Sequence, residues 1–572
     1  MSATATVATP EWVRRSNENA QTLLDVTARF RPEEAGFFGV AGLDEQTIDL
    51  GPGVEHRLVE ATTRALDALR PKLATEKDRL VRQDLEILIR RAELTIESAT
   101  LSERLLLPYF HLAEIVFQGL RALLDEQVAP ERREKAVVRL RRYAGLEPGT
   151  AAVAKLAEER IREKFGVAGL VGPFAGKLEK DLGNAAPLIN GIAELFKRYE
   201  LRGWETAFEE LKKQMAGYEA FLRAEVLPRC RPAFALPPEI YKLRLQLIGI
   251  EMPLEELTGR ARASFREIQN EMNALALLVA RERDWKHTDY RPVLGELKKQ
   301  QIVGEQILPH YEERIAALEK LIREHDVVTL PDRPMQIRLA SEAESAAIPA
   351  PNMRMPRMIG NTGEKGTFVL PLRIPGAPGK QTLQFDDFTF DAASWTLTAH
   401  EGRPGHELQF AAMVERGVTI ARAIFAMNST NVEGWALYAE AEMKPYEPLE
   451  GQLAALQARL LRAARAFLDP GLQAGEITRE EATRVLREDV GLSEAMALQE
   501  VERYTFWAPA QAPSYFCGYQ RLLEIRTDAE RTLGPRFVRR AFNDFLLAQG
   551  LLPPSLLRKA VLDEFVPSQK AS

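Results

Sequence analysis

The feature that most constrains this chain is a long run of helical sequence pattern. From about residue 56 to 326, Leu, Ala, Glu, Arg and Lys dominate and apolar residues recur at helical spacing, as in EKDRLVRQDLEILIRRAELTIESA. Gly/Pro punctuation at 146–150, 171–176 and 228–238 supplies turns between the helices. The pattern predicts stacked antiparallel helices. Because the chain has 572 residues, it predicts two or three lobes or one large helical body.

The helical period is lost at about residue 327, where β-branched residues and prolines enter in VVTLPDRPMQIRLA and later in GTFVLPLRI. These two segments predict a small sheet or hairpin. Between them, residues 348–366 are rich in Pro, Gly and Asn and too long for a simple connector, so we expect them to be either disordered or part of a site. Helical sequence resumes near 390. We therefore predict an N-terminal helical region, 1–326, followed by a region, 327–572, that carries the chemistry.

Composition excludes several classes of function. The net charge of −6 shows no basic excess of the kind that binds nucleic acid. The longest apolar stretches, such as ALALLVA, fall far short of the ~20 residues that span a bilayer. Only Cys230 and Cys517 are present, too few for a disulfide framework. The first residues lack the apolar core of a signal peptide, so the sequence predicts a cytoplasmic protein.

Two histidines lie close together in TAHEGRPGHELQF, which otherwise has the character of a helix. His400 and His406 are six residues apart, so an unbroken helix would place them roughly 240° apart, unable to share one ion. Pro404 cannot donate its backbone N–H and Gly405 tolerates unusual dihedral angles. This pair can therefore open the helix into a bulge and turn the second imidazole toward the first. Glu401 would then act as the general base for an attacking water, as the Glu of HExxH does.

A third ligand is needed for a catalytic zinc that keeps one position open. The segment NVEGWALYAEAEM reads as a helix in which Glu433 and Glu440, seven residues apart, share a face. Glu433 is the predicted ligand and Glu440 is predicted to orient a ligand histidine, although the two roles could be reversed. In isolation both would be ordinary acids on a helix surface. The remaining five histidines are scattered singly, and we expect them to be structural.

A last cluster lies in VERYTFWAPAQAPSYFCGYQRLLEIR. Tyr515 and Arg526 project from one helical face about three turns apart, and Gly518 leaves room between them. The Tyr515 hydroxyl could stabilise the oxyanion of a tetrahedral intermediate. Equally, the two residues could be a packing side chain and a surface ion pair. Arg526, Arg521 and Arg354 are each candidates to bind a substrate carboxylate, and nothing in the sequence selects among them.

Together these segments resemble the large bacterial family called domain of unknown function 885, whose members resemble zinc-dependent metallopeptidases of the gluzincin type. The resemblance covers roughly residues 40 to 565. The HExxPGH signature is met by His400, Glu401, Pro404, Gly405 and His406, followed by Gln409. The EGWA motif is met by Glu433, Gly434, Trp435 and Ala436, followed by Tyr438 and Glu440. The C-terminal pattern of RY, PGQA and YxxG is met by Arg503, Tyr504, Pro509, Gln511, Ala512, Tyr515 and Gly518.

The resemblance implies a mainly α fold around a deep cleft, with a small β-sheet beside the site and the 1–326 region as one wall. It implies that an edge strand holds an extended peptide by backbone pairing, and Gly366 to Leu372 is the candidate strand. Two departures stand out: Glu407 replaces a histidine often found after PGH, and Ala510 replaces the Gly of PGQA, a conservative change unless a positive φ is needed.

The resemblance implies His400, His406 and Glu433 as ligands of one Zn²⁺, and Glu401 as the base, in agreement with the spacing argument. Tyr515 completes the predicted catalytic pair. The other predicted substrate-binding or supporting residues are Glu440, Tyr438, Arg503, Tyr504, Gln511, Tyr519, Arg526 and Phe368.

The predicted function is a zinc hydrolase that cleaves amide bonds, chiefly of short peptides, because a cleft in a helical shell excludes folded chains. Two alternatives stay open: a metal-dependent amidohydrolase of a non-peptide metabolite, and a catalytically silent peptide-binding protein. The partners are therefore a short peptide or small amide, with no nucleic acid and no membrane. The sequence gives no oligomeric state.

Overall fold

The predicted mainly helical fold is confirmed by a computed structural model, which describes residues 10–348, 350–371 and 385–571. Before residue 327 the α-helices are α1 (Glu11–Phe30), α2 (Pro32–Phe38), α3 (Val54–Thr75), α4 (Arg79–Leu105), α5 (Leu112–Arg121), α6 (Pro130–Arg133), α7 (Lys135–Tyr143), α8 (Val153–Arg162), α9 (Ala175–Arg198), α10 (Glu205–Phe221), α11 (Pro238–Ile248), α12 (Leu254–Glu282), α13 (Tyr290–Lys298) and α14 (Ile307–Glu324).

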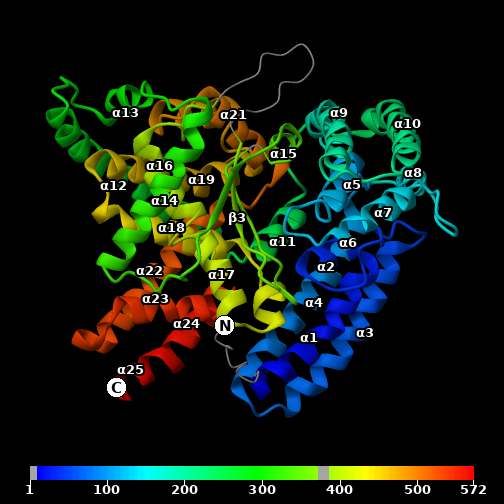
Figure 1. Ribbon diagram of the computed structural model, residues 1–572, viewed down its shortest axis with the longest axis horizontal. Helices are drawn as coiled ribbons and strands as arrows, with labels where there is room; N and C mark the ends of the chain where they lie inside the picture. The colour runs from blue at the N-terminus through cyan, green and yellow to red at the C-terminus, as the bar shows by residue number, and fades with distance from the viewer. Residues whose placement is uncertain (1–9, 349, 372–384, 572) are drawn as a thin grey trace.

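After residue 327 the α-helices are α15 (Glu342–Ala347), α16 (Asp391–Glu401), α17 (His406–Arg416), α18 (Ser429–Met443), α19 (Leu449–Ala474), α20 (Arg479–Arg484), α21 (Glu494–Glu502), α22 (Pro513–Leu533), α23 (Arg539–Ala548), α24 (Pro554–Ala560) and α25 (Val566–Ala571). The strands are β1 (Gln336–Leu339), β2 (Asn352–Arg354) and β3 (Thr367–Leu370). In Figure 1 the strand β3 lies between the helices α1–α10 and a second group that includes α12, α14, α16, α18 and α19.

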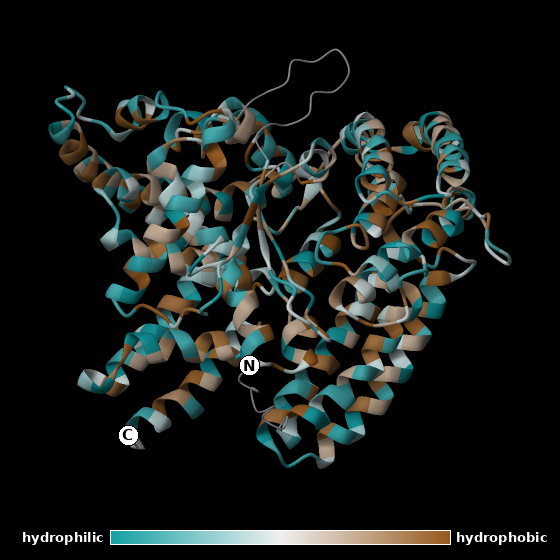
Figure 2. Ribbon diagram, viewed as in Figure 1, coloured by the Kyte–Doolittle hydropathy of each residue, from teal (hydrophilic) through white to brown (hydrophobic). Residues whose placement is uncertain are grey.

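Helix α4 shows how the sequence pattern becomes structure. Its N-cap is Asp78, whose carboxylate accepts hydrogen bonds from the backbone N–H groups of Leu80 and Val81. Val81, Leu85 and Leu88 recur at helical spacing and are buried. Of the charged residues between them, Glu86 is exposed, whereas Asp84 is buried and pairs with Arg422. Figure 2 shows the same alternation of hydrophobic and hydrophilic residues along many of the helices. Tertiary burial of such apolar stripes is what stabilises helices of this kind.

The hydrophobic cores cross the predicted boundary at residue 326. One core joins α1, α3 and α4 with α17, α18, α22 and α23, and another joins α12 and α13 with α16, α19 and α22. A third core joins α5, α7, α8, α9 and α10 with α15. The two predicted regions therefore share their interior, and helices from both stabilise the part of the chain that carries the predicted chemistry.

The predicted small sheet is present with three strands in the order β1-β3-β2. β1 runs parallel to β3 and β2 runs antiparallel to it, with Met353 opposite Phe368. The prediction that 366–372 is an edge strand is wrong, because β3 is paired on both sides. A central strand buried on both faces is a continuous apolar run, as TFVL is, whereas β1 and β2 are partly exposed. Leu372, the last residue of the predicted strand, lies outside the described residues.

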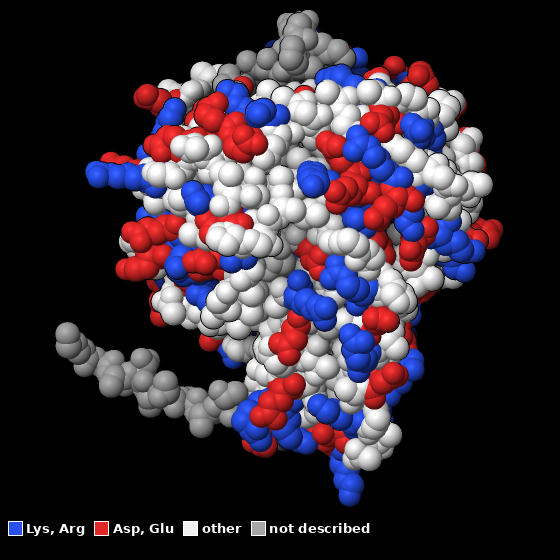
Figure 3. Space-filling view, turned by 90° about the vertical axis from the view of Figure 1, so that its right-hand side faces the viewer, with Lys and Arg blue, Asp and Glu red and all other residues white. Residues whose placement is uncertain are grey.

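The segment 350–366 forms part of the described structure. It contains β2, and the backbone N–H groups of Met358 and Ile359 both donate to the carbonyl oxygen of Phe38 in α2. It therefore joins the sheet to the N-terminal helices. Among the described residues, no helix has both the length and the apolar character needed to cross a bilayer. The face of the molecule drawn in Figure 3 carries acidic and basic side chains intermixed.

Candidate metal site

The chain between the two predicted ligand histidines ends one helix and begins another. α16 ends at Glu401 and α17 begins at His406. Pro404 follows a cis peptide bond, and a Cβ on Gly405 would lie 1.9 Å from the carbonyl oxygen of His400, so only glycine fits this close approach. The expected bulge within one helix is thus a complete break between two helices. The phase between the histidines is reset by this connection, as the sequence argument required.

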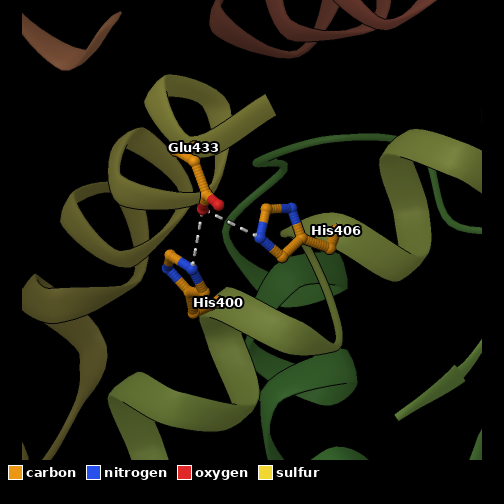
Figure 4. A group of neighbouring side chains, drawn as sticks. All are labelled: His400, His406 and Glu433. Atoms are coloured by element: carbon orange, nitrogen blue, oxygen red, sulfur yellow. Dashed lines mark ion pairs between the residues drawn. The ribbon is translucent and has the colours of Figure 1, made fainter. Parts of the chain in front are cut away.

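The two imidazoles and one carboxylate converge on a common point (Figure 4). The rings of His400 and His406 have centroids 4.7 Å apart and planes inclined at 80°. Glu433 Oε2 lies 3.5 Å from His400 Nε2 and 3.3 Å from His406 Nε2. One ligand atom from each of the three residues lies within 4.8 Å of the other two, the only such group of His, Cys, Asp or Glu among the described residues.

These three residues fit a zinc ion. Glu433 Oε2 is buried and has no hydrogen-bond partner among the described residues, an arrangement that is costly unless a further cation is bound there. Burial raises the pKa of Glu433, but the adjacent imidazoles of His400 and His406 outweigh it and hold this pKa well below its usual value. Two imidazole nitrogens and one carboxylate oxygen are the donor set of catalytic zinc sites that keep a fourth position open.

Glu440 holds His400 from the opposite side of the ring. Its Oε1 lies 2.6 Å from His400 Nδ1, and its Oε2 accepts a hydrogen bond of 2.7 Å from Thr396. Burial opposes ionisation of Glu440, but Arg462, His400 and Thr396 together lower its pKa below the usual value. An ionised Glu440 fixes the tautomer of His400 with Nε2 free to bind a metal. The sequence left the roles of the two acids open. The geometry favours Glu433 as the metal ligand and Glu440 as the residue that orients His400.

The carboxylate of Glu433 is oriented by Gln511, which lies in the turn before α22. Gln511 Nε2 donates to Glu433 Oε1 at 3.3 Å and to Ser429 Oγ at 2.9 Å, which leaves Oε2 facing the imidazoles. The helices α18 and α22 cross at a glycine contact, because a Cβ on Gly434 would lie 2.6 Å from the backbone of Gly518. The sequence predicted that Gly518 leaves room on its own helix between Tyr515 and Arg526. In the structure, helix α18 fills this room.

Glu401 lies next to the predicted metal site, but it is neither one of the three predicted ligands nor a residue that orients one of them. It lines the cavity, is 7% exposed, and its Oε2 has no hydrogen-bond partner among the described residues. Burial raises the pKa of Glu401 to about 7, with a further increase from Glu433 and a decrease from His406. A carboxylate with a pKa near neutrality can both accept and return a proton, which is the property required of a general base that later acts as an acid.

Tyr515 lies against the first ligand. Its ring stacks on that of His400 with centroids 6.1 Å apart and planes inclined at 14°. Its hydroxyl oxygen accepts a hydrogen bond of 2.9 Å from Arg503 Nη2, so the hydroxyl proton remains available to a substrate. Burial raises the pKa of Tyr515, although Arg503 lowers it, and the phenol therefore stays protonated at neutral pH.

These groups open into a cavity of about 600 Å³. Its walls include the three predicted ligands, Glu401, Glu440, Gln511 and Tyr515, together with Asn352 and Met353 of β2 and three arginines, Arg462, Arg465 and Arg503. Sequence reasoning missed the first two arginines, whereas β2 lies in the segment that it expected to be either disordered or part of a site. The signal for the arginines was present, because LLRAARAF places two charges in an otherwise apolar helix.

A buried ion-pair network holds the break between α16 and α17, and sequence reasoning missed it too. Arg403 Nε donates to Glu407 Oε2 at 2.7 Å, and Arg333 Nη1 donates to Glu407 Oε1 at 2.8 Å. Glu407 is fully buried. The indole of Trp435 donates to the carbonyl oxygen of Pro404 at 3.0 Å. Glu407, which departs from the family pattern, therefore stabilises the connection rather than contacting the cavity.

Five predicted supporting residues do not line the cavity: Tyr438, Tyr504, Tyr519, Arg526 and Phe368. Arg526 pairs with Glu442 and Glu530 and donates to the Tyr438 hydroxyl. Eleven residues along α22 correspond to roughly 16 Å, which explains why Arg526 and Tyr515 reach different surroundings.

The other predicted residues that do not line the cavity also have local partners. Tyr504 donates to Glu500, Arg459 donates to the Tyr519 hydroxyl, and Phe368 is fully buried in the core beside the sheet. Arg521 and Arg354 pair with Glu524 and Asp125. None of the three arginines that the sequence offered for a substrate carboxylate therefore lies at the cavity.

Ala510 adopts a left-handed conformation with φ of 75°, which an L side chain disfavours. The Asp469 carboxylate holds this turn by accepting the Ala510 N–H at 3.0 Å. We expect Ala510→Gly to stabilise the protein by about 0.5–1 kcal/mol, because relief of strain exceeds the added unfolded-state entropy. Thermal unfolding tests this. Ala508→Gly, at a negative φ of −143°, is the control and should lower the melting temperature; a decrease for Ala510→Gly as well would contradict the strain.

Comparison with known proteins defines the wider relationships. Residues 32–561 match the family described as "Bacterial protein of unknown function (DUF885)". Among curated proteins, none is significantly similar in sequence.

Two solved structures share the fold. The "putative lipoprotein from Colwellia psychrerythraea" is 18% identical, with 97% of this chain and 99% of that chain covered and a TM-score of 0.77. The "putative lipoprotein of unknown function from Shewanella oneidensis" is 17% identical, with 97% and 100% covered and a TM-score of 0.69. Similarity at these identities shows the fold alone.

Proposed function

This chain belongs to the DUF885 family of bacterial proteins, and we propose that it is a zinc-dependent hydrolase that cleaves amide bonds of short peptides. Family membership by itself names no activity. The observation that carries the proposal is the position of Glu433 Oε2. It is buried, has no hydrogen-bond partner among the described residues, and lies 3.5 Å from His400 Nε2 and 3.3 Å from His406 Nε2. His400, His406 and Glu433 would hold one Zn²⁺, with Glu440 fixing the first histidine.

A bound zinc ion would polarise the substrate carbonyl and lower the pKa of the attacking water. Glu401 takes the proton from that water as its oxygen attacks the carbonyl carbon. Tyr515 donates a hydrogen bond from its hydroxyl group to the carbonyl oxygen as negative charge develops there, while Arg503 holds the phenol in place. When the C–N bond breaks, Glu401 transfers its proton to the leaving nitrogen, so that the products are an acid and an amine and the site returns to its starting state.

The position of the sheet supports a peptide substrate. β2 is an edge strand that contributes Asn352 and Met353 to the cavity wall, so its backbone groups can pair with an extended chain. We therefore propose that β2, and not β3, is the edge strand that pairs with an extended peptide. A cavity of about 600 Å³ has the size of a small-ligand site, which favours a few residues of peptide over a folded protein.

Metal analysis and a substrate panel test the proposed function together. We expect about one zinc ion per chain and hydrolysis of short peptides that is lost on chelation and restored by zinc. Cleavage restricted to non-peptide amides would favour a metabolite amidohydrolase. Stoichiometric zinc and peptide binding without any hydrolysis would favour a silent peptide-binding protein. A protein that binds no metal and hydrolyses peptides would exclude the proposal.

The cytoplasmic location also stays a proposal. It rests on the two cysteines, both free in the structure. The two solved structures of the same fold carry the word lipoprotein in their descriptions. Cell fractionation of the native host protein distinguishes a cytoplasmic from a membrane-attached form.

A further inference from the structure

Three arginines surround Tyr515 at the wall of the metal cavity. Arg462 and Arg465 lie on α19, and Arg503 begins the short π-helical turn η7 (Arg503–Trp507). Their guanidinium carbons lie 5.7, 4.4 and 5.4 Å from the centre of the Tyr515 ring, respectively. All three line the cavity. Such a concentration of buried positive charge is unusual in a protein interior and needs compensation.

The protein compensates these charges only in part. Arg465 makes two hydrogen bonds of 2.7 Å to Glu500. Arg503 lies 3.5 Å from Glu500 and donates to Tyr515. Arg462 has only weak contacts, at 3.3 Å to the carbonyl oxygen of Ala458 and 3.4 Å to Glu440.

Each of the three guanidinium groups is incompletely hydrogen-bonded within the protein. Arg462 Nε, Arg465 Nη1 and Arg503 Nε are buried and have no hydrogen-bond partner among the described residues. Arg465 is 3% exposed, so solvent does not satisfy its free nitrogen. A buried donor without an acceptor costs free energy, which a ligand that supplies the acceptor recovers.

The charge count points to an anion as that acceptor. Two carboxylates, Glu500 and Glu440, contact the three guanidinium groups, and Glu440 is shared with His400. These contacts leave one of the three guanidinium groups without a carboxylate of its own, and Glu433, a further ionised acid of the cavity, is the predicted metal ligand. A divalent cation at the proposed site would add further positive charge. An anionic substrate group would balance it in surroundings where electrostatic interactions are strong.

We propose that Arg462, Arg465 and Arg503 form a carboxylate-binding subsite that anchors an acidic group of the substrate beside the metal ligands. Guanidinium groups bind carboxylates through paired, charge-assisted hydrogen bonds. The Tyr515 ring lies 6.1 Å from that of His400 and 5.7 Å from the Arg462 guanidinium carbon. Since an extended residue spans ~3.5 Å, the anchored carboxylate lies within about three residues of the bond that is cleaved.

This inference deepens the proposed function and rests on it for the identity of the ligand as a peptide. The carboxylate has two possible sources, the peptide C-terminus and an Asp or Glu side chain. A C-terminal anchor would make the protein remove one to about three residues from the carboxyl end. A side-chain anchor would make it select acidic residues within the peptide.

Calorimetric binding to the full-length, metal-depleted protein tests the subsite without any activity. The probes are N-acetyl-trialanine, its C-terminal amide, and the same amide with a central Glu. We expect the free acid to bind at least about tenfold more tightly than the amide, given the strength of charge-assisted hydrogen bonds. If the Glu-containing amide binds tightly while the free acid binds no better than the plain amide, the anchor is a side-chain carboxylate; if both bind tightly, the subsite accepts either source. Equal affinities for all three probes, or no binding of any, would overturn the subsite.

Arg462→Gln is the most informative variant because Arg462 has the fewest partners. It should weaken binding of the free acid by about 10- to 100-fold and leave binding of the amide unchanged. Arg521→Gln, on the neighbouring helix α22 and paired with Glu524 away from the cavity, is the matched control and should change neither. Equal losses for acid and amide in Arg462→Gln would contradict a specific carboxylate contact. Far-ultraviolet circular dichroism and the melting temperature establish that both variants are folded.

The outcomes separate this inference from the proposed function. If the zinc-loaded protein hydrolyses peptides but binds acid and amide probes alike, the subsite is excluded and the hydrolase stands. If the metal-depleted protein selects the acid and loses that selectivity in Arg462→Gln, but the zinc-loaded protein hydrolyses no amide, the subsite stands and the hydrolase is excluded.

Discussion

Glu401→Gln should lower kcat by about 10²–10⁴-fold, the contribution typical of general acid–base catalysis, and leave the zinc content at about one ion per chain. Glutamine is nearly isosteric with glutamate, so it preserves packing at this buried position. It cannot take a proton from water at neutral pH, and the transfer to the leaving amine is lost with it. Steady-state kinetics on the best peptide of the panel and metal analysis of the same preparation measure the two quantities.

Glu415→Gln is the matched control for this variant. Glu415 lies on α17 close to the site in sequence, but it is partly exposed and pairs with Arg333 outside the cavity. We expect near-normal kcat and zinc content for it. A Glu401→Gln protein with near-normal turnover would rule out Glu401 as the base. A Glu401→Gln protein that lost its zinc would show that Glu401 is needed for metal binding and not only for proton transfer.

Glu433→Gln should abolish stoichiometric zinc binding, whereas Glu440→Gln should retain zinc with an affinity lowered by about 10–100-fold, the usual effect of removing a group that orients a ligand. The reason is geometric. Glu433 Oε2 faces both imidazoles, while Glu440 contacts only the distal nitrogen of His400. Titration of metal-depleted protein with zinc against a competing chelator measures both affinities. Because the amide introduced by Glu433→Gln lacks the negative charge of a carboxylate ligand, the loss in this variant should exceed that in Glu440→Gln.

The same titration settles which acid is the third ligand. A larger loss of affinity for Glu440→Gln than for Glu433→Gln would reverse the two roles and would require His400 to bind metal through the other nitrogen. Similar small losses for both would show that the two histidines hold the ion with a different third ligand. The melting temperatures of the metal-depleted variants show whether either change acts through stability alone.

The helical class could be predicted because its cause is local. Each helix is specified by its own apolar period and caps, as α4 is by Asp78 and its buried stripe. The order of the strands could not be predicted in the same way, because pairing depends on segments far apart in the chain. The apolar run of β3 already indicated a central strand, buried on both faces, and this signal was assigned instead to an edge.

The meeting of the two imidazoles was predictable because the spacing of His400 and His406 is itself a geometric constraint. His400 and His406 need a break between them to meet, and Pro404 with Gly405 supplies one. Supporting residues carry no such constraint. Arg526 was assigned to the site from a shared helical face, yet its partners come from α18 and from its own helix. A side chain with several possible partners is placed by the elements that pack against it, which a single helix does not reveal.

The sequence by itself determined the helices, the break between α16 and α17, and the residue types that would gather around one ion. Only the tertiary structure decided which groups meet. The glycine crossing of α18 and α22 brings Glu433 beside Tyr515, and the packing of α19 adds Arg462 and Arg465 to the cavity. The physical reason is that helix formation depends on neighbours within about four residues, whereas a site depends on how whole helices cross, and that is set by burial of apolar faces from the entire chain.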